Sequence, residues 1–211
     1  MKKIAFLVAL LAACVAMGRA QESRQDISLS GIGLIEPFTA SSTTVQVNST
    51  PAYGALLSYR FMLTPSSALE ANYGITYQNS IRYWSPSMGC LPSGVCPGQK
   101  VLTRTQEISG AFVHSFVVKN WNPFIEAGPA GLIFLPIMNS GTTTLQAKQQ
   151  TQIGGLFGAG FAYEISPSFD IRAEYRGYVT KVPTFGDSQV ATTRWYHPWV
   201  SVPTVGIAYH F

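Results

Sequence analysis

The sequence predicts an all-β protein: a closed eight-stranded antiparallel up-and-down transmembrane β-barrel with a polar lumen filled by side chains. Apolar residues recur at every second position, which is the period of a strand. Only 11% of the 211 residues are charged, against about 25% in an average soluble domain. No segment runs 18 apolar residues without a polar interruption, so strands rather than helices are expected to cross the membrane.

The first 20 residues predict an export signal that is removed. Lys2 and Lys3 precede an apolar run of about 13 residues, and Gly18 and Ala20 are small residues at the −3 and −1 positions of a cleavage site. Cleavage there removes three of the 14 basic residues, so their excess over the 10 acidic residues falls from four to one. A nucleic-acid partner is not expected, because no basic stripe remains to neutralise phosphates.

A competing cleavage site stays open. Residues 11–14, Leu-Ala-Ala-Cys, resemble the lipobox of bacterial lipoproteins, in which Cys14 would be acylated. The apolar residues that follow Cys14 favour the ordinary site, because a lipoprotein cysteine is usually followed by a polar linker. The expected domain plan is therefore a signal peptide at 1–20, a short periplasmic segment at 21–26 and the barrel at 27–211.

Eight segments of alternating pattern follow the signal, each near the length of about 10 residues that a transmembrane strand needs. They are residues 27–35, 52–61, 68–78, 105–116, 124–134, 152–163, 169–179 and 200–211. The connections at 36–51, 79–104, 135–151 and 180–199 are long and polar, whereas those at 62–67, 117–123 and 164–168 are short. Long connections at one end and short ones at the other are typical of outer-membrane barrels, with tight periplasmic turns and larger external loops.

The charged residues fall on one face of these strands. In residues 52–61, for example, Tyr53, Leu57 and Phe61 share one face and Arg60 lies on the other. In hydrocarbon a sheet cannot leave edges unpaired, and a barrel of eight strands encloses only enough room for side chains. Buried charges must pair, so the polar faces are expected to form a salt-bridged plug. A gated proton or ion path is the functional alternative for this cluster. Its members are Arg60, Glu70, Glu107, Glu126, Arg172, Glu174 and Arg176.

Two features fit this plan poorly. Pro129 and Pro203 each lack the N–H that a strand ladder uses, so we expect β-bulges there or strand boundaries displaced past Pro203. Phe124, Leu132 and Phe134 share the phase of the charged face, and they are expected at the ends of the lumen.

The chain ends on an aromatic residue, Phe211, with Val205, Ile207 and Tyr209 at alternating positions before it. This resembles the C-terminal signal that the barrel-assembly machinery reads in bacterial outer-membrane barrels. Together with the glycine-rich segment 154–163, it makes the chain similar to the small outer-membrane β-barrel family that includes the OmpA-like transmembrane domain.

The resemblance implies an integral protein of the bacterial outer membrane. Its partners would be outer-membrane lipid and lipopolysaccharide, and the barrel-assembly machinery during biogenesis. Full-length OmpA-type proteins add a periplasmic peptidoglycan-binding domain. Because the sequence stops at Phe211, a cell-wall tether is not expected.

Cys90 and Cys96 lie in the longest of the connections, at 79–104. In an oxidising compartment two nearby cysteines are expected to form a disulfide. No further His or Cys lies close by in the sequence, so a metal site is not expected, and no cofactor motif is present.

An enzyme is not expected either. His114 and Ser115 invite comparison with outer-membrane lipid A deacylases, whose motif spaces His and Ser two apart on one side of a strand. Adjacent residues face opposite sides. His197 lies near Asp187 and serines in an external connection, but proximity in sequence is not a triad. The expected function is a scaffold that displays four external loops for surface interaction. A lipid-modifying enzyme or a small passive channel are the alternatives.

Overall fold

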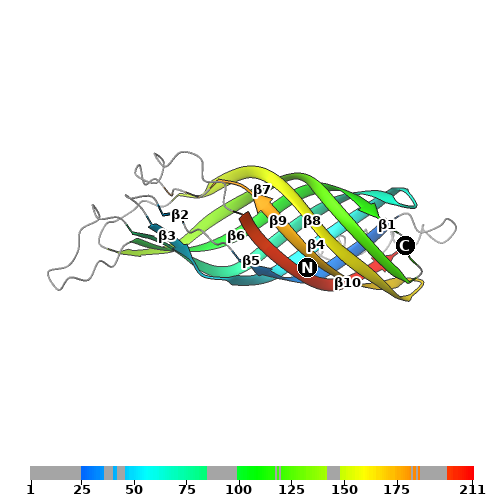
Figure 1. Cartoon of the computed structure of the whole chain (residues 1–211). Coiled ribbons are helices and arrows are strands. Elements are labelled where there is room, and N and C mark those ends of the chain that lie inside the picture. Colours follow the sequence, from blue (N-terminus) through cyan, green and yellow to red (C-terminus); the bar gives the residue numbers. More distant parts are fainter. Residues whose placement is uncertain are drawn as a thin grey trace, which may run out of the picture.

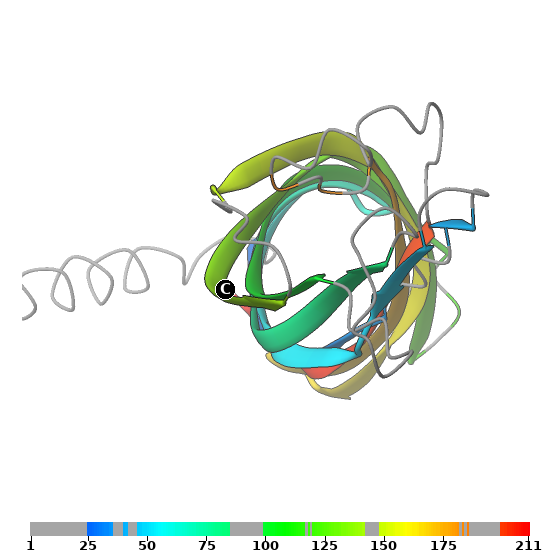
Figure 2. The ribbon, with the colours of Figure 1, turned by 90° about the vertical axis from the view of Figure 1, so that its left-hand side faces the viewer.

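The protein is a closed antiparallel β-barrel, which confirms the predicted fold class (Figures 1 and 2). The computed structural model describes residues 25–35, 40–41, 46–84, 99–116, 118, 120–141, 148–181, 183, 185 and 199–211. In these ranges no helix is long and apolar enough to cross a membrane. The export signal, Cys14, Cys90, Cys96, Asp187 and His197 lie outside the described residues.

Eight long strands form the wall. They are β1 (Gln25–Leu34), β4 (Ala52–Thr64), β5 (Ser67–Trp84), β6 (Gln99–Ser115), β7 (Trp121–Gly141), β8 (Gln150–Ser166), β9 (Phe169–Val179) and β10 (Trp199–His210). Each pairs with its neighbours in the chain order of the wall, and β1 closes the ring by pairing with β10. Two short strands, β2 (Ala40–Ser41) and β3 (Gln46–Ser49), continue the sheet beside β5.

The two ends of the barrel differ as the connection lengths predict. Two-residue turns join β4 to β5 at 65–66 and β8 to β9 at 167–168. The chain ends at the same end, where the Phe211 amide donates to the Gln25 carbonyl oxygen at 3.0 Å. We call this the periplasmic end. β2 and β3 lie at the opposite, external end, beside the outer ends of β5, β6 and β7 (Figure 1).

The strands extend further outward than the alternation predicts. β5 runs to Trp84, β6 begins at Gln99 and β7 runs to Gly141, so parts of the connections expected at 79–104 and 135–151 are strand. Register shifts accompany this extension, between Ile75 and Gln78 on β5 and between Leu102 and Thr103 on β6. Beyond the hydrocarbon layer neither face of a strand must be apolar. The alternation that marks a strand in the sequence is therefore lost there, although the ladder continues.

Within the membrane the two faces separate as expected. On β4 the alternate side chains from Tyr53 to Phe61 are exposed, whereas Leu56, Ser58 and Arg60 are buried. On β9 the buried positions run from Asp170 to Tyr178. The exterior is thus an apolar, lipid-facing surface, and the described charges of the transmembrane segments point inward.

Pro129 and Pro203 lie inside continuous strands, and the predicted bulges are absent at both. Each proline keeps one ladder intact: Pro129 pairs with Gly155 on β8, and Pro203 pairs with Tyr175 on β9. On the other side, the β6–β7 and β1–β10 ladders skip the proline and resume in the same register. The bulge prediction was wrong because an antiparallel residue points its N–H toward one neighbour only. A proline therefore removes hydrogen bonds from one seam, and the other seam fixes the register.

Candidate functional site

The inward-facing side chains divide the lumen into two halves. We call the half nearer the periplasmic end the charged half. It contains Arg60, Glu70, Glu107, Glu126, Arg172, Glu174 and Arg176 and is joined by Asp26. We call the half nearer the external end the apolar half. It contains Ile32, Leu34, Leu56, Leu132, Phe134, Leu156, Tyr178, Phe185, Val200 and Val202.

Arg60 and Glu70 form the tightest ion pair of the charged half. They are direct register partners on β4 and β5, so the hairpin itself places the two side chains together. Arg60 Nε donates to Glu70 Oε2 at 2.7 Å, and Nη2 lies 2.6 Å from the same oxygen. The guanidinium also lies over the ring of Phe124, 4.7 Å from its centroid. This arrangement holds a buried cation against both a carboxylate and an aromatic face.

Arg172 joins three strands of the wall. Its Nη2 donates to Asp26 Oδ2 on β1 at 3.1 Å, and its Nη1 donates to the Ser28 hydroxyl at 3.3 Å. The guanidinium lies 3.8 Å from Glu70 Oε2 on β5 and 3.9 Å from Glu174 Oε1 on β9. Because β1 and β9 flank the closing strand β10, Arg172 ties the two sides of that closure together.

Arg176 joins β6, β7 and β9. Its Nε donates to Glu126 Oε1 at 3.0 Å, its Nη1 lies 3.2 Å from Glu107 Oε1, and its Nη2 donates to the Ser109 hydroxyl at 3.3 Å. The Ser109 hydroxyl in turn donates to Glu107 at 2.7 Å. The three arginines therefore gather the seven residues of the predicted cluster into two ion-pair networks, one around Arg60 and Arg172 and the other around Arg176.

Three polar members of this region were not included in the predicted cluster. Asp26 was left out because the first strand was expected to begin at residue 27, whereas β1 begins at Gln25. Counting the inward phase back from Ser28 would have found it. Asp170 and His210 lie at the ends of β9 and β10, and His210 Nε2 lies 2.8 Å from Asp170 Oδ2. Only the register of these two strands brings that pair together.

The glycine-rich face of β8 makes room for the large inward groups. A Cβ at Gly158 would lie 2.5 Å from Glu126 Oε1, and a Cβ at Gly160 would lie 2.7 Å from Phe124 Cζ. Glycines at every second position thus leave space on one wall that the side chains of β7 fill. The spacing was visible in the sequence, but its partner strand was not.

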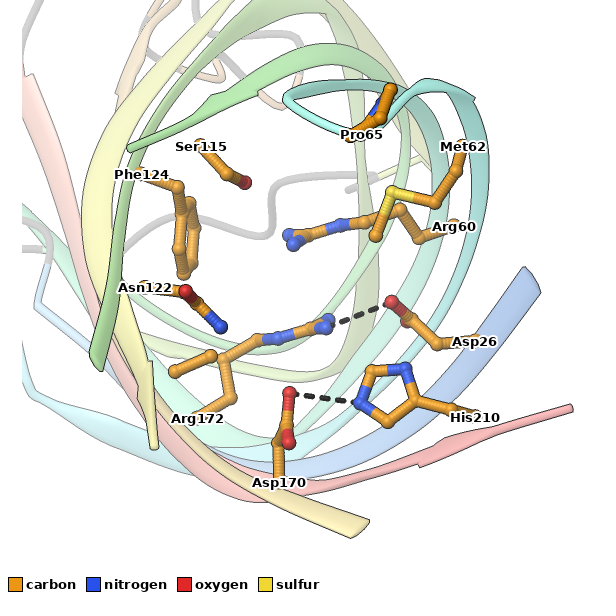
Figure 3. A pocket seen from close by; sticks show the side chains of 11 residues that line it. Asp26, Arg60, Met62, Pro65, Ser115, Asn122, Phe124, Asp170, Arg172 and His210 are labelled. Carbon is orange, nitrogen blue, oxygen red and sulfur yellow. Dashed lines mark hydrogen bonds and ion pairs between the residues drawn. The ribbon is translucent and has the colours of Figure 1, made fainter. Parts of the chain in front are cut away.

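A small cup lies below the charged half at the periplasmic end (Figure 3). Its volume is about 90 Å³, enough for a few water molecules. Arg60 and Arg172 project into it, Asn122 and Ser115 line it, and the Asp170–His210 pair forms part of its wall (Figure 3). The ion pairs above the cup separate it from the apolar half.

The apolar half occludes the lumen a second time. Leu132 and Phe134 on β7 and Val200 and Val202 on β10 are all buried and belong to one apolar cluster. Phe185, which follows β9, is also buried in this cluster. Its φ of 47° is rare for a bulky residue, and the burial of its ring offsets that strain. Phe124 lines the cup at the periplasmic end, and Phe134 lies in the apolar half. Leu132 was also expected at an end of the lumen, but it lies directly opposite Glu107 in the β6–β7 ladder.

The other candidate residues are scattered. His114 Nδ1 lies 3.3 Å from the Ser67 hydroxyl at the periplasmic end of the wall, whereas the adjacent Ser115 lines the cup. Among the described residues, no group of three or more His, Cys, Asp or Glu side chains could hold a metal ion. Of the predicted assembly signal, Val205 and Ile207 face outward and are exposed, and the Tyr209 ring stacks on Phe211 with centroids 6.0 Å apart.

A closed antiparallel barrel with an apolar exterior and a charged, occluded interior is an integral outer-membrane β-barrel protein of bacteria, as predicted. Residues 135–211 match the family model of the OmpA-like transmembrane domain. No curated protein matches the sequence. The family match and the fold confirm the predicted resemblance to small outer-membrane barrels and the predicted location.

Solved structures share the fold at low sequence identity. Outer membrane protein OprG from Pseudomonas aeruginosa aligns with a TM-score of 0.62 and 11% identity, covering 90% of this chain and 97% of that one. Neisserial surface protein A aligns with a TM-score of 0.56 and 13% identity, covering 90% of this chain and 98% of that one. The N-terminal β-barrel domain of Pseudomonas aeruginosa OprF aligns with a TM-score of 0.51 and 14% identity, covering 90% of this chain and 100% of that one.

Proposed function

We propose that the protein is a structural scaffold of the outer membrane that displays its four external connections for surface interaction. The observation that carries this proposal is the double occlusion of the lumen. Ion pairs span the charged half, and the side chains around Phe134 and Phe185 fill the apolar half. A filled barrel has no continuous path for solute, but it is a rigid support on which external segments can vary.

The extended strands at the external end support the same function. β5, β6 and β7 remain paired beyond the register shifts on β5 and β6, and β3 pairs with the outer part of β5. This sheet carries the outer ends of β5, β6 and β7 beyond the transmembrane part of the barrel. A partner on another surface would then meet these connections before it met the barrel.

Epitope insertion tests the orientation and the display. A short tag between residues 84 and 99 is expected to bind antibody on intact cells. The matched control carries the tag in the β4–β5 turn, between Pro65 and Ser66, and is expected to bind only after the cells are permeabilised. Both variants should keep the faster gel mobility of unboiled barrels. The opposite labelling pattern in folded variants would contradict the proposal.

Planar-bilayer recording and lipid analysis separate the scaffold from its alternatives. We expect no stepwise conductance from the purified barrel, with a porin as the positive control. We also expect an unchanged mass of lipid A in cells that express it. Stepwise conductance would favour a passive channel, and a changed lipid A mass would favour a lipid-modifying enzyme. Either result would overturn the scaffold.

The C-terminal residues Val205, Ile207, Tyr209 and Phe211 are proposed as the signal that the barrel-assembly machinery reads. The exposure of Val205 and Ile207 on one face of β10 supports this. Deletion of Phe211 is expected to lower the amount of folded barrel in cells while leaving refolding into vesicles in vitro nearly unchanged. Equal losses in the two settings would indicate a purely structural role.

A further inference from the structure

The surface charges of the described residues are separated between the two ends. The exposed or half-buried basic residues Lys100, Arg104, Lys148 and Lys181 all lie at the external end. Among the described acidic residues, those of the lumen are buried, and the exposed one, Glu164, lies at the periplasmic turn. Every exposed or half-buried charged residue that the structure describes at the external end is therefore positively charged.

Two of these basic residues share the outward face of β6. The odd-numbered positions of β6 from Val101 to Val113 are buried in the lumen, so Arg104 and Lys100 face outward. No hydrogen bond or ion pair joins either side chain to another residue in the described ranges.

Arg104 lies where the hydrocarbon layer ends. Below it, Ile108 and Phe112 are outward-facing apolar side chains, 56% and 48% exposed. A transmembrane strand needs about 10 residues to cross, and that length counted from the periplasmic end of β6 at Ser115 ends just before Arg104. Tyr77 on neighbouring β5 is exposed near this level. An arginine at this depth meets lipid headgroups rather than acyl chains.

We propose that Arg104 and Lys100 bind the headgroup of a phosphorylated glycolipid in the outer leaflet of the membrane. Arg104 and Lys100 are four residues apart, which is about 13 Å along a strand. That separation fits two anionic groups of one headgroup better than a single phosphate. Arg104 can bind a phosphate with two parallel hydrogen bonds, and Lys100 contributes a point charge.

The choice of a lipid follows from the apolar surface directly beneath the cations. A soluble anion would contact only the charges, whereas a glycolipid can also lay its acyl chains against Ile108 and Phe112. This inference depends on the external orientation given under Proposed function. The lipid-binding proposal and the proposed orientation can be disproved independently. Epitope labelling reports the orientation in cells, whereas the following experiment measures lipid binding in vitro.

The test is titration of the purified barrel in detergent with diphosphorylated lipid A, read by native mass spectrometry. The double variant Arg104→Gln/Lys100→Gln is expected to bind about tenfold more weakly or worse, a change of about 1.4 kcal/mol. The charge-matched control is Lys148→Gln/Lys181→Gln, which removes two cations from the same end and is expected to bind like the wild type. Both variants change surface side chains, and unboiled gel mobility checks that they fold.

Two further arms exclude simpler explanations. Dephosphorylated lipid A should bind the wild type as weakly as diphosphorylated lipid A binds the Arg104/Lys100 variant. Inorganic phosphate in millimolar excess should not displace the lipid. An equal loss in both double variants would reveal diffuse electrostatic attraction instead of a site. Binding that ignores the phosphates would reveal ordinary contact with boundary lipid. Either result would overturn the proposal.

Discussion

Toward the periplasmic end the buried inward side chains include the charged residues of the lumen, and toward the external end they are apolar or carry hydroxyl groups. Both sets occupy the same phase of the same strands. On β7, Glu126 lies in the charged half, and Leu132 and Phe134 lie in the apolar half. On β9, Arg176 and Tyr178 lie on the two sides of the boundary. One inward face therefore carries two kinds of core.

The difference shows how a narrow barrel can be closed in two ways. In the charged half Arg172 and Arg176 each contact more than one carboxylate, so removal of either cation leaves several anions uncompensated. In the apolar half each contact is weak and none depends on a particular partner. The charged half is thus expected to be sensitive to the identity of a residue, and the apolar half to its volume.

The largest effect is expected in the charged half, from Arg176→Met. The change leaves Glu107 and Glu126 buried without their shared cation, which should lower the free energy of unfolding by about 3–5 kcal/mol. Urea unfolding in phospholipid vesicles measures it. The control, Lys181→Met at an exposed position, should stay within about 0.5 kcal/mol of wild type. Similar stability of the two variants would mean that the ion pairs do not hold the barrel closed.

The apolar half should respond to loss of volume, as Leu132→Ala will show. Leu132 is 2% exposed, and its truncation opens a cavity that should cost about 2–4 kcal/mol. The matched control is Ile153→Ala, because Ile153 is 82% exposed on the outward face of β8. Lipid chains fill the space there, so we expect about half the cost or less. Equal losses in the same urea assay would contradict a packed apolar half.

A smaller effect is expected where β8 makes room for Glu126. Gly158→Ala puts a methyl group against the Glu126 carboxylate, and this overpacking should cost about 1–3 kcal/mol. Gly155→Ala is the control on the same strand, since a Cβ there meets nothing within 4 Å. The temperature at which half of the protein loses the faster gel mobility of the folded barrel should be lower for Gly158→Ala than for Gly155→Ala. A higher midpoint for Gly158→Ala than for the wild type would show that Glu126 and the surrounding strands can shift to accept the added methyl group.

The smallest effect is expected from Glu174→Gln. The lumen holds more carboxyl than guanidinium groups among the described residues, and Glu174 is only weakly paired, 3.9 Å from Arg172 and 3.3 Å from the Thr204 hydroxyl. Loss of this charge should change stability by about 1 kcal/mol or less, because the arginine keeps its other carboxylates. A loss comparable to that of Arg176→Met would show that every charge in the cluster is equally required.

Much of the fold could be predicted because each strand of a barrel in lipid must alternate between outward apolar side chains and inward side chains. The strand through residues 169–179 was predicted with its observed bounds, and its inward set from Asp170 to Tyr178 followed from the period of two. The prediction weakened where that constraint ends, as in the outer parts of β5 and β7. It was wrong at Pro129 and Pro203, because the pattern of one strand does not say which seam loses its hydrogen bonds.

The candidate site shows the same limit. The seven charged residues were found by their phase, yet their partners were not. Arg60 and Glu70 belong to one hairpin, so local sequence already brings them close. Arg172 reaches Asp26 from the far end of the chain, a contact that depends on how β10 closes the ring between β1 and β9.

The sequence by itself determined which side of each strand faces lipid, because every outward side chain in the membrane must be apolar and the period of two leaves only one other side. It also determined that the barrel must close, because hydrocarbon tolerates no unpaired edge. The pairing of the charges, the height at which the core turns apolar, and the seam that absorbs each proline were decided only in the tertiary structure. These depend on the register between strands, and register is a relation between segments that no single segment carries.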